Sequence, residues 1–281
     1  MATVYQALEV TTVQGHVTDG FPPRVQPRQS RHFTRTWRML PAMLLMCASV
    51  ASAQTTTQLW GNLTFNWAKS ERLVYELDFE PKALLNPPEG EPDWRNLDVT
   101  PNVEYALRPR FDLVGEMTLG RTLQTDAVHS TEVTARFGVR FHLFSRAQKF
   151  RILEQAPLRR IVVRDLVRVE SRNFFYSGGD TESDSTVRFR NRLELLVPLN
   201  RERITDDGAR YVLADWEWFI PVDDPEERFA SRQRIRTGIG YRRSLNWRYE
   251  LLYIWTRSRN TIDEEFSTNE NIIDIRVRRV F

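Results

Sequence analysis

The chain has 281 residues, of which 41% are hydrophobic and 27% charged, so it is long enough for one large domain or two small ones. Residues 1–53 hold five of the 40 basic and two of the 37 acidic side chains, which leaves 35 of each in residues 54–281. Residues 54–281 are therefore neutral overall, with positive and negative charges interspersed. This argues against a nucleic-acid partner, because nucleic-acid-binding proteins present a surface patch of one charge sign.

The N-terminal part of the chain is typical of an export signal. Residues 1–38 are polar and contain three prolines, which indicates a disordered extension or a start assigned too early. Residues 39–53 form a short apolar run that ends in the small-residue cleavage pattern Ala51-Ser52-Ala53. We therefore expect residues 54–281 to be exported as the mature chain, with Ala51 and Ala53 marking the cleavage site.

Strand periodicity dominates the mature chain, and helical periodicity is nearly absent. Apolar side chains alternate with polar or charged ones, as expected when successive residues point to opposite faces of a strand. Eleven candidate strands follow one another at 59–69, 72–79, 97–107, 111–120, 131–143, 161–176, 186–197, 210–220, 232–241, 247–256 and 269–281. Because bacterial barrels made from one chain normally have an even number of strands, we expect ten to twelve and prefer twelve.

The stretch TVRFRNRLELLV at 186–197 shows the alternation most clearly. One face carries Arg188, Arg190, Arg192 and Glu194, and the other carries Val187, Phe189, Leu193 and Leu195. In a soluble sheet the apolar face would form the core. In a membrane barrel it would meet lipid, and the charges would fill the lumen.

Three features favour the membrane barrel. The expected export signal is followed in the sequence by strands alone, and a closed barrel crosses a bilayer without any apolar helix. The connections alternate between short or basic ones, such as 108–110 and 242–246, and long acidic ones, such as 80–96 and 221–227. Aromatic residues gather near strand ends, where lipid headgroups lie, and the chain ends on Phe281. A terminal Phe resembles the signal by which bacterial outer-membrane proteins are recognised for assembly.

The sequence therefore predicts an all-β transmembrane antiparallel meander barrel over residues 54–281, in the bacterial outer membrane, with a narrow lumen of paired charges. The predicted lumen-facing charges are Arg164, Arg168, Glu170, Arg172, Arg188, Arg190, Arg192, Glu194, Asp215, Glu217, Arg234, Arg236, Asp274 and Arg276. The expected partners are outer-membrane lipids, lipopolysaccharide and the barrel assembly machinery; the sequence names no solute. Arginine-lined constrictions favour anions, so a narrow anion-selective pore is the first alternative, and a soluble periplasmic β-sheet binding protein is the second.

Neither catalysis nor a cofactor is expected. Only His129 and His142 remain in the mature chain, which has no cysteine. His129 is expected in a loop and His142 among the lumen hydrogen bonds. Two separated histidines provide neither a catalytic triad nor a transition-metal cluster.

Several motifs in sequence order resemble a known family. They are QLWGNLTFNW (58–67), VRFRNRLELLVPL (187–199), YVLADWEWF (211–219), SRQRIRTGIGYR (231–242) and WRYELLYIW (247–255). Together they resemble the uncharacterised bacterial outer-membrane family known as domain of unknown function 2490. The resemblance implies an outer-membrane barrel and transfers no catalytic residues.

Overall fold

The structure is a computed structural model that describes residues 55–87, 92–126, 128–143, 160–178, 182–222, 231–259 and 266–281. The predicted N-terminal extension and export signal, with Ala51 and Ala53, lie outside these residues, as does most of the connection 145–160. The described residues form no helix long and apolar enough to cross a membrane.

Eleven strands make up the described part of the chain. They are β1 (Thr56–Ala68), β2 (Leu73–Asn86), β3 (Trp94–Arg108), β4 (Phe111–Gln124), β5 (His129–His142), β6 (Val162–Ser177), β7 (Asp184–Pro198), β8 (Ala209–Pro221), β9 (Arg232–Ser244), β10 (Trp247–Ser258) and β11 (Ser267–Val280). Each pairs with its neighbours in chain order, and together they form a closed barrel. The all-β class and the meander order are thus confirmed.

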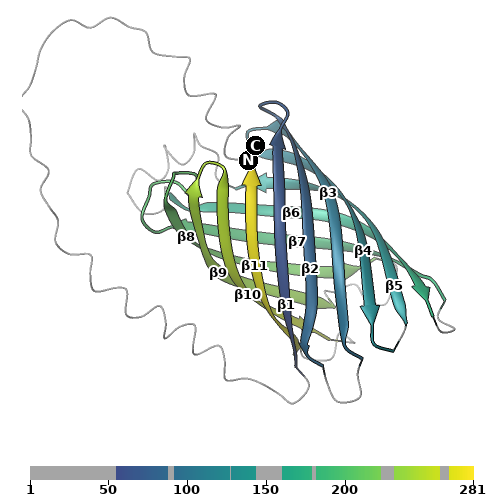
Figure 1. Ribbon diagram of the computed structural model, residues 1–281. Coiled ribbons are helices and arrows are strands. Elements are labelled where there is room, and N and C mark those ends of the chain that lie inside the picture. The colour runs from purple at the N-terminus through teal and green to yellow at the C-terminus, as the bar shows by residue number, and fades with distance from the viewer. Residues whose placement is uncertain are drawn as a thin grey trace, which may run out of the picture.

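Closure differs from the expectation in one respect. β1 and β11 pair in parallel, with Trp60 opposite Asp274, and Figure 1 shows the two strands side by side with arrows pointing the same way. All other neighbours are antiparallel. In an up-and-down meander with an odd number of strands, the first and last run in the same direction. The eleven strands lie within the predicted range of ten to twelve. The closed barrel holds one strand fewer than the preferred twelve, and one of its strand pairs is parallel.

The connections lie at two ends of the barrel. At the first end, here called the turn end, residues 69–72, 109–110, 199–208 and 245–246 join successive strands. At the opposite end, the loop end, the connections include 87–93, 178–183, 222–231 and 259–266. The connection 125–128 is also at the loop end and is short, so long loops are not present between every pair of strands there.

The predicted loop 80–96 was too long at both ends. β2 continues through Pro81 to Asn86, and β3 begins at Trp94, so Glu80 and Lys82 belong to a strand. Proline has no N–H for the ladder and usually argues against an interior strand position. Here Gly61 lies beside it on β1: a Cβ on Gly61 would come within 3.2 Å of the Pro81 ring. The missing side chain accommodates the proline.

The two faces of the wall differ in polarity, with the apolar face outside. On β7, Leu193 and Leu195 are 39% and 38% exposed, whereas Arg190 and Glu194 are 6% and 9% exposed. The same inversion recurs around the barrel, where exposed apolar side chains include Leu59, Leu63, Leu97, Val103, Met117, Leu119, Phe137, Val169, Ile239, Leu251 and Ile275. Charged side chains are the buried ones.

One part of the interior is apolar, which the sequence did not predict. Its buried residues are Leu196, Tyr211, Leu213, Leu252, Ile254 and Ile272. Two of them, Leu252 and Ile254, sit in the uninterrupted apolar run LLYIW (251–255), where the residues between the outward-facing Leu251, Tyr253 and Trp255 are apolar as well.

Candidate functional site

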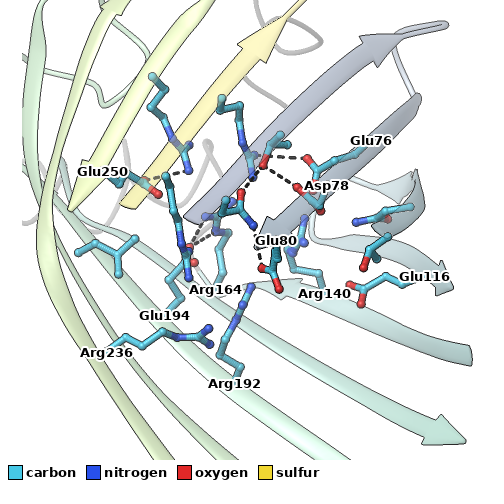
Figure 2. Close-up of a pocket in the computed structure, with 18 of the residues that line it drawn as sticks. Glu76, Asp78, Glu80, Glu116, Arg140, Arg164, Arg192, Glu194, Arg236 and Glu250 are labelled. Carbon is cyan, nitrogen blue, oxygen red and sulfur yellow. Dashed lines mark hydrogen bonds and ion pairs between the residues drawn. The ribbon is translucent and has the colours of Figure 1, made fainter. Parts of the chain in front are cut away.

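The barrel encloses a cavity of about 710 Å³, to which all eleven strands contribute side chains. Figure 2 shows acidic residues from β2 and β4 and basic residues from β5, β6, β7 and β9 projecting into it. The side chains reach the interior from every second position of each strand, so the pleat itself places them there.

The structure places the predicted lumen charges in two layers. Ten line the cavity: Arg164, Arg168, Arg172, Arg188, Arg190, Arg192, Glu194, Arg234, Arg236 and Arg276. The other four, Glu170, Asp215, Glu217 and Asp274, do not line it and are buried. The guanidinium groups of the inner wall thus face the cavity, and several of their carboxylate partners are not exposed to it.

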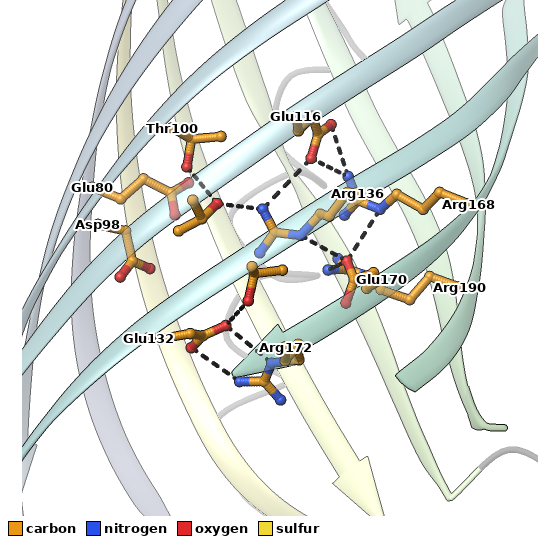
Figure 3. A network of polar contacts seen from close by, with 12 residues as sticks. Glu80, Asp98, Thr100, Glu116, Glu132, Arg136, Arg168, Glu170, Arg172 and Arg190 are labelled. Carbon is orange, nitrogen blue, oxygen red and sulfur yellow. Dashed lines mark hydrogen bonds and ion pairs between the residues drawn. The ribbon is translucent and has the colours of Figure 1, made fainter. Parts of the chain in front are cut away.

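Glu170 on β6 is the centre of one ion-pair network, shown in Figure 3. Its side chain has no exposed surface. Nε of Arg136 lies 2.9 Å and Nε of Arg188 2.6 Å from its oxygens, Arg168 lies 3.4 Å away, and Arg190 makes a close contact. Four guanidinium groups therefore compensate one buried carboxylate that would otherwise be costly to desolvate.

Glu217 on β8 is the centre of a second network and is equally buried. Arg190 Nη2 donates to it at 2.5 Å and Arg236 Nη2 at 3.1 Å, and Arg168 and Arg234 each lie 3.7 Å away. Because Arg168 and Arg190 contact both carboxylates, the two networks are continuous across β6, β7, β8 and β9.

Further ion pairs join strands that are not neighbours. Arg168 of β6 donates to Glu116 of β4 at 2.8 and 2.9 Å, across β5. Arg140 of β5 likewise pairs with Glu104 of β3. Such contacts stiffen the barrel across its inner surface, in addition to the backbone ladder.

Aromatic rings interleave with the arginines. Phe219, 3% exposed, lies 4.8 Å from the guanidinium of Arg188, 4.5 Å from that of Arg190 and 5.3 Å from that of Arg234. Arg234 on β9 is also 5.2 Å from the ring of Trp60 on β1. A cation over an aromatic face is electrostatically favourable, so these rings stabilise the arginines in addition to their carboxylate partners.

Sequence reasoning missed an acidic group on the opposite side of the barrel. Its cavity-lining members are Glu76, Asp78 and Glu80 on β2, Asp98 and Glu104 on β3, and Glu116 on β4. The signal was present, since Glu76, Asp78 and Glu80 alternate with Tyr75, Leu77 and Phe79. The predicted loop at 80–96, which was too long, placed Glu80 and Lys82 outside the strand and so ended this alternation too soon.

The histidines occupy strand ends. His142 is paired with Asp112 at 2.5 Å and lines the cavity, in the hydrogen-bonding position expected of it. His129 is the first residue of β5, so its predicted loop position was wrong, and its Nδ1 accepts a hydrogen bond from the Gln124 backbone at 3.3 Å. Within the described ranges, no three His, Cys, Asp or Glu side chains are grouped so that they could hold a metal ion.

Phe281 lies at the turn end, on the outer surface. Its ring is 58% exposed and stacks on Trp67 at a centroid distance of 5.5 Å, and its backbone N–H donates to Asn66 at 3.0 Å. The terminal residue is therefore attached to β1 and completes the junction at which the barrel closes.

A model of the family described as protein of unknown function (DUF2490) matches residues 57–266, which covers β1 through β10. The chain belongs to the DUF2490 family. This confirms the resemblance found in the strand motifs. No curated protein matches the chain.

Proposed function

We propose that this DUF2490 protein is an integral outer-membrane β-barrel with a charge-paired, arginine-rich lumen, and that it has a structural role or a role in envelope transport and is not an enzyme. The observation that carries the proposal is the inverted polarity of the wall. Ionic groups such as Glu170 and Glu217 are buried inside, whereas Phe137 (64% exposed) and Ile275 (50% exposed) project outward. Water-soluble proteins rarely expose large contiguous apolar surfaces, and a bilayer is the solvent that such a surface fits.

Strand length and the aromatic residues support the same proposal. The strands have 12 to 16 residues, more than the roughly 9–11 needed to cross a bilayer core at a tilt. Aromatic pairs occur near both ends: Trp67 with Phe281 and Phe111 with Phe141 at the turn end, and Trp216 with Trp218 and Tyr253 with Trp255 toward the loop end. Rings with a polar edge favour the headgroup level, which would give two girdles.

Fractionation tests this proposal. Cells express the tagged mature chain behind its own signal, and the outer-membrane fraction is compared with the periplasm by gel mobility before and after boiling. We expect the protein in the outer-membrane fraction with heat-dependent migration, because a closed barrel stays folded in detergent until heated. A soluble periplasmic product without a mobility shift would overturn the proposal in favour of the soluble sheet.

A further inference from the structure

On six of the eleven strands, the charges that line the cavity are largely separated by sign into two arcs, whereas β5, β10 and β11 carry both signs. The acidic arc comprises the six carboxylates Glu76, Asp78, Glu80, Asp98, Glu104 and Glu116, on β2, β3 and β4. Among the described residues, Lys82 is the one cation that these three strands add to the cavity lining. Five of these carboxylates pair with a cation, either Lys82 or an arginine on β5, β6 or β11, and Asp78 does not pair with any in the described part of the chain.

The basic arc lies on β6, β7 and β9. It comprises the ten arginines Arg164, Arg168, Arg172, Arg188, Arg190, Arg192, Arg232, Arg234, Arg236 and Arg242. Glu194 is the one carboxylate that these strands contribute to the described cavity lining. The carboxylates that compensate several of these arginines, Glu170 and Glu217, have no exposed side-chain surface.

Barrel order sets the two arcs across from one another. β3, in the middle of the acidic arc, is five strands from β8 in one direction around the barrel and six in the other. β7 and β9, which carry most of the basic arc, flank β8. The lumen therefore holds a charge separation directed across its width.

Each arc also contains a charge with no close counter-ion. Asp78 accepts a hydrogen bond from the Thr64 hydroxyl at 2.5 Å, but no cationic group of the described residues lies within 4 Å of it. Arg192, shown projecting into the cavity in Figure 2, forms no ion pair with the described residues, and its Nε has no hydrogen-bond partner. Both side chains line the cavity and lack an ionic partner among the described residues.

We propose that the lumen binds a small zwitterionic solute, with its cationic group at the acidic arc near Asp78 and its anionic group at the basic arc near Arg192. A simple anion would be attracted by one arc and repelled by the other, whereas a zwitterion can satisfy both. The cavity of about 710 Å³ is of the size that holds small molecules and not polymers. The proposal deepens the proposed transport role by naming a solute class, although binding itself does not depend on membrane location.

The test uses the folded full-length mature barrel in detergent micelles. The probes are ω-amino acids from glycine to 8-aminooctanoate, with hexanoate and hexylammonium as singly charged controls matched to 6-aminohexanoate. Binding is measured by calorimetry and by the fluorescence change of tryptophan, since Trp60 lines the cavity. We expect an optimum in chain length, with affinity about tenfold or more above that of either control, because two charge-assisted contacts replace one.

Two variants tie the binding to the arcs. Asp78→Asn and Arg192→Gln should each weaken the best ω-amino acid about tenfold and abolish its advantage over the singly charged controls. Glu71→Gln, in an exposed turn, should change nothing. Heat-dependent migration verifies that each variant is folded.

Three results would overturn the proposal. They are absence of binding, equal binding of hexanoate with no effect of Asp78→Asn (a simple anion site), and a zwitterion preference that persists in both variants. Fractionation separately decides the membrane proposal. If the protein fractionates with the periplasm but still shows the chain-length optimum, the zwitterion proposal stands and the outer-membrane proposal is overturned.

Discussion

At the scale of single residues, the unusual feature is the complete burial of a few carboxylates among arginines. Glu170 and Glu217 have no exposed surface, and each lies among four guanidinium groups. Replacing a whole buried ion-pair set by apolar groups is often tolerated, but removing one member leaves its partners unpaired. The arginines around Glu170 would then repel one another.

We predict that Glu170→Gln lowers the free energy of unfolding by about 3–5 kcal/mol. Urea titration of the heat-modifiable band measures the change. Glu132→Gln is the matched comparison, because Glu132 is 21% exposed and, among the described residues, its ion pair is with Arg172 alone, at 3.0 Å; it should cost about 1 kcal/mol or less. If both variants lost the same free energy of unfolding, burial of the carboxylate would not increase its contribution to stability.

At the scale of strands, one glycine allows two neighbouring strands to pack an aromatic side chain on the inner wall. A Cβ on Gly240 of β9 would lie 2.1 Å from Cζ of Tyr211 on β8. Tyr211 is 1% exposed and donates a hydrogen bond from its hydroxyl to Glu250 at 2.6 Å. The ring thus covers the glycine and extends to β10, which links three strands through one side chain.

We predict that Gly240→Ala destabilises the barrel by about 1–3 kcal/mol, because the new methyl group displaces the Tyr211 ring. Urea titration again provides the measurement. Gly115→Ala is the control, since nothing lies within 4 Å of a Cβ there, and it should be nearly neutral. In a Tyr211→Ala background the Gly240→Ala change should cost nothing further; an undiminished cost would mean that the clash is not with the ring.

At the scale of the whole molecule, the apolar side chains exposed on the outer wall, here called the apolar belt, distinguish the membrane proposal from a soluble barrel. Met117 and Leu123 both lie on β4 and are 47% and 51% exposed. Met117 is near the middle of its strand, whereas Leu123 is the residue before its end. In water these two positions would be equivalent. In a bilayer they differ in depth.

We predict that Met117→Arg lowers the stability of the barrel in phospholipid vesicles by about 2–4 kcal/mol, and Leu123→Arg by about 0–1 kcal/mol. The folded fraction of each variant after insertion into vesicles, read from heat-dependent migration, provides the measurement. If the two variants were indistinguishable, the belt would not be in lipid.

Much of the wall could be predicted from local alternation. The stretch TVRFRNRLELLV assigned Arg190 and Glu194 to one face and Leu193 and Leu195 to the other, as the structure has them. Prediction failed at Pro81, where the alternation is interrupted and which a glycine on the next strand accommodates. In the run LLYIW the side chains of Leu252 and Ile254 face inward, and the prediction of a charged lumen did not anticipate apolar residues there. Of the acidic arc, only Glu80 fell in the predicted loop, and its other members lay on the polar faces of predicted strands without being assigned to the lumen.

The sequence by itself determined the period-two strands, the all-β class and the order in which charged faces follow one another, because these depend on side chains one or two positions apart. Only the tertiary structure decided that the apolar face is outside and that eleven strands close through a parallel pair. Alternation is symmetric between two faces, so it cannot say which one lines a lumen. Charges that are interspersed along the chain become separated into acidic and basic arcs only when closure sets β3 across from β8.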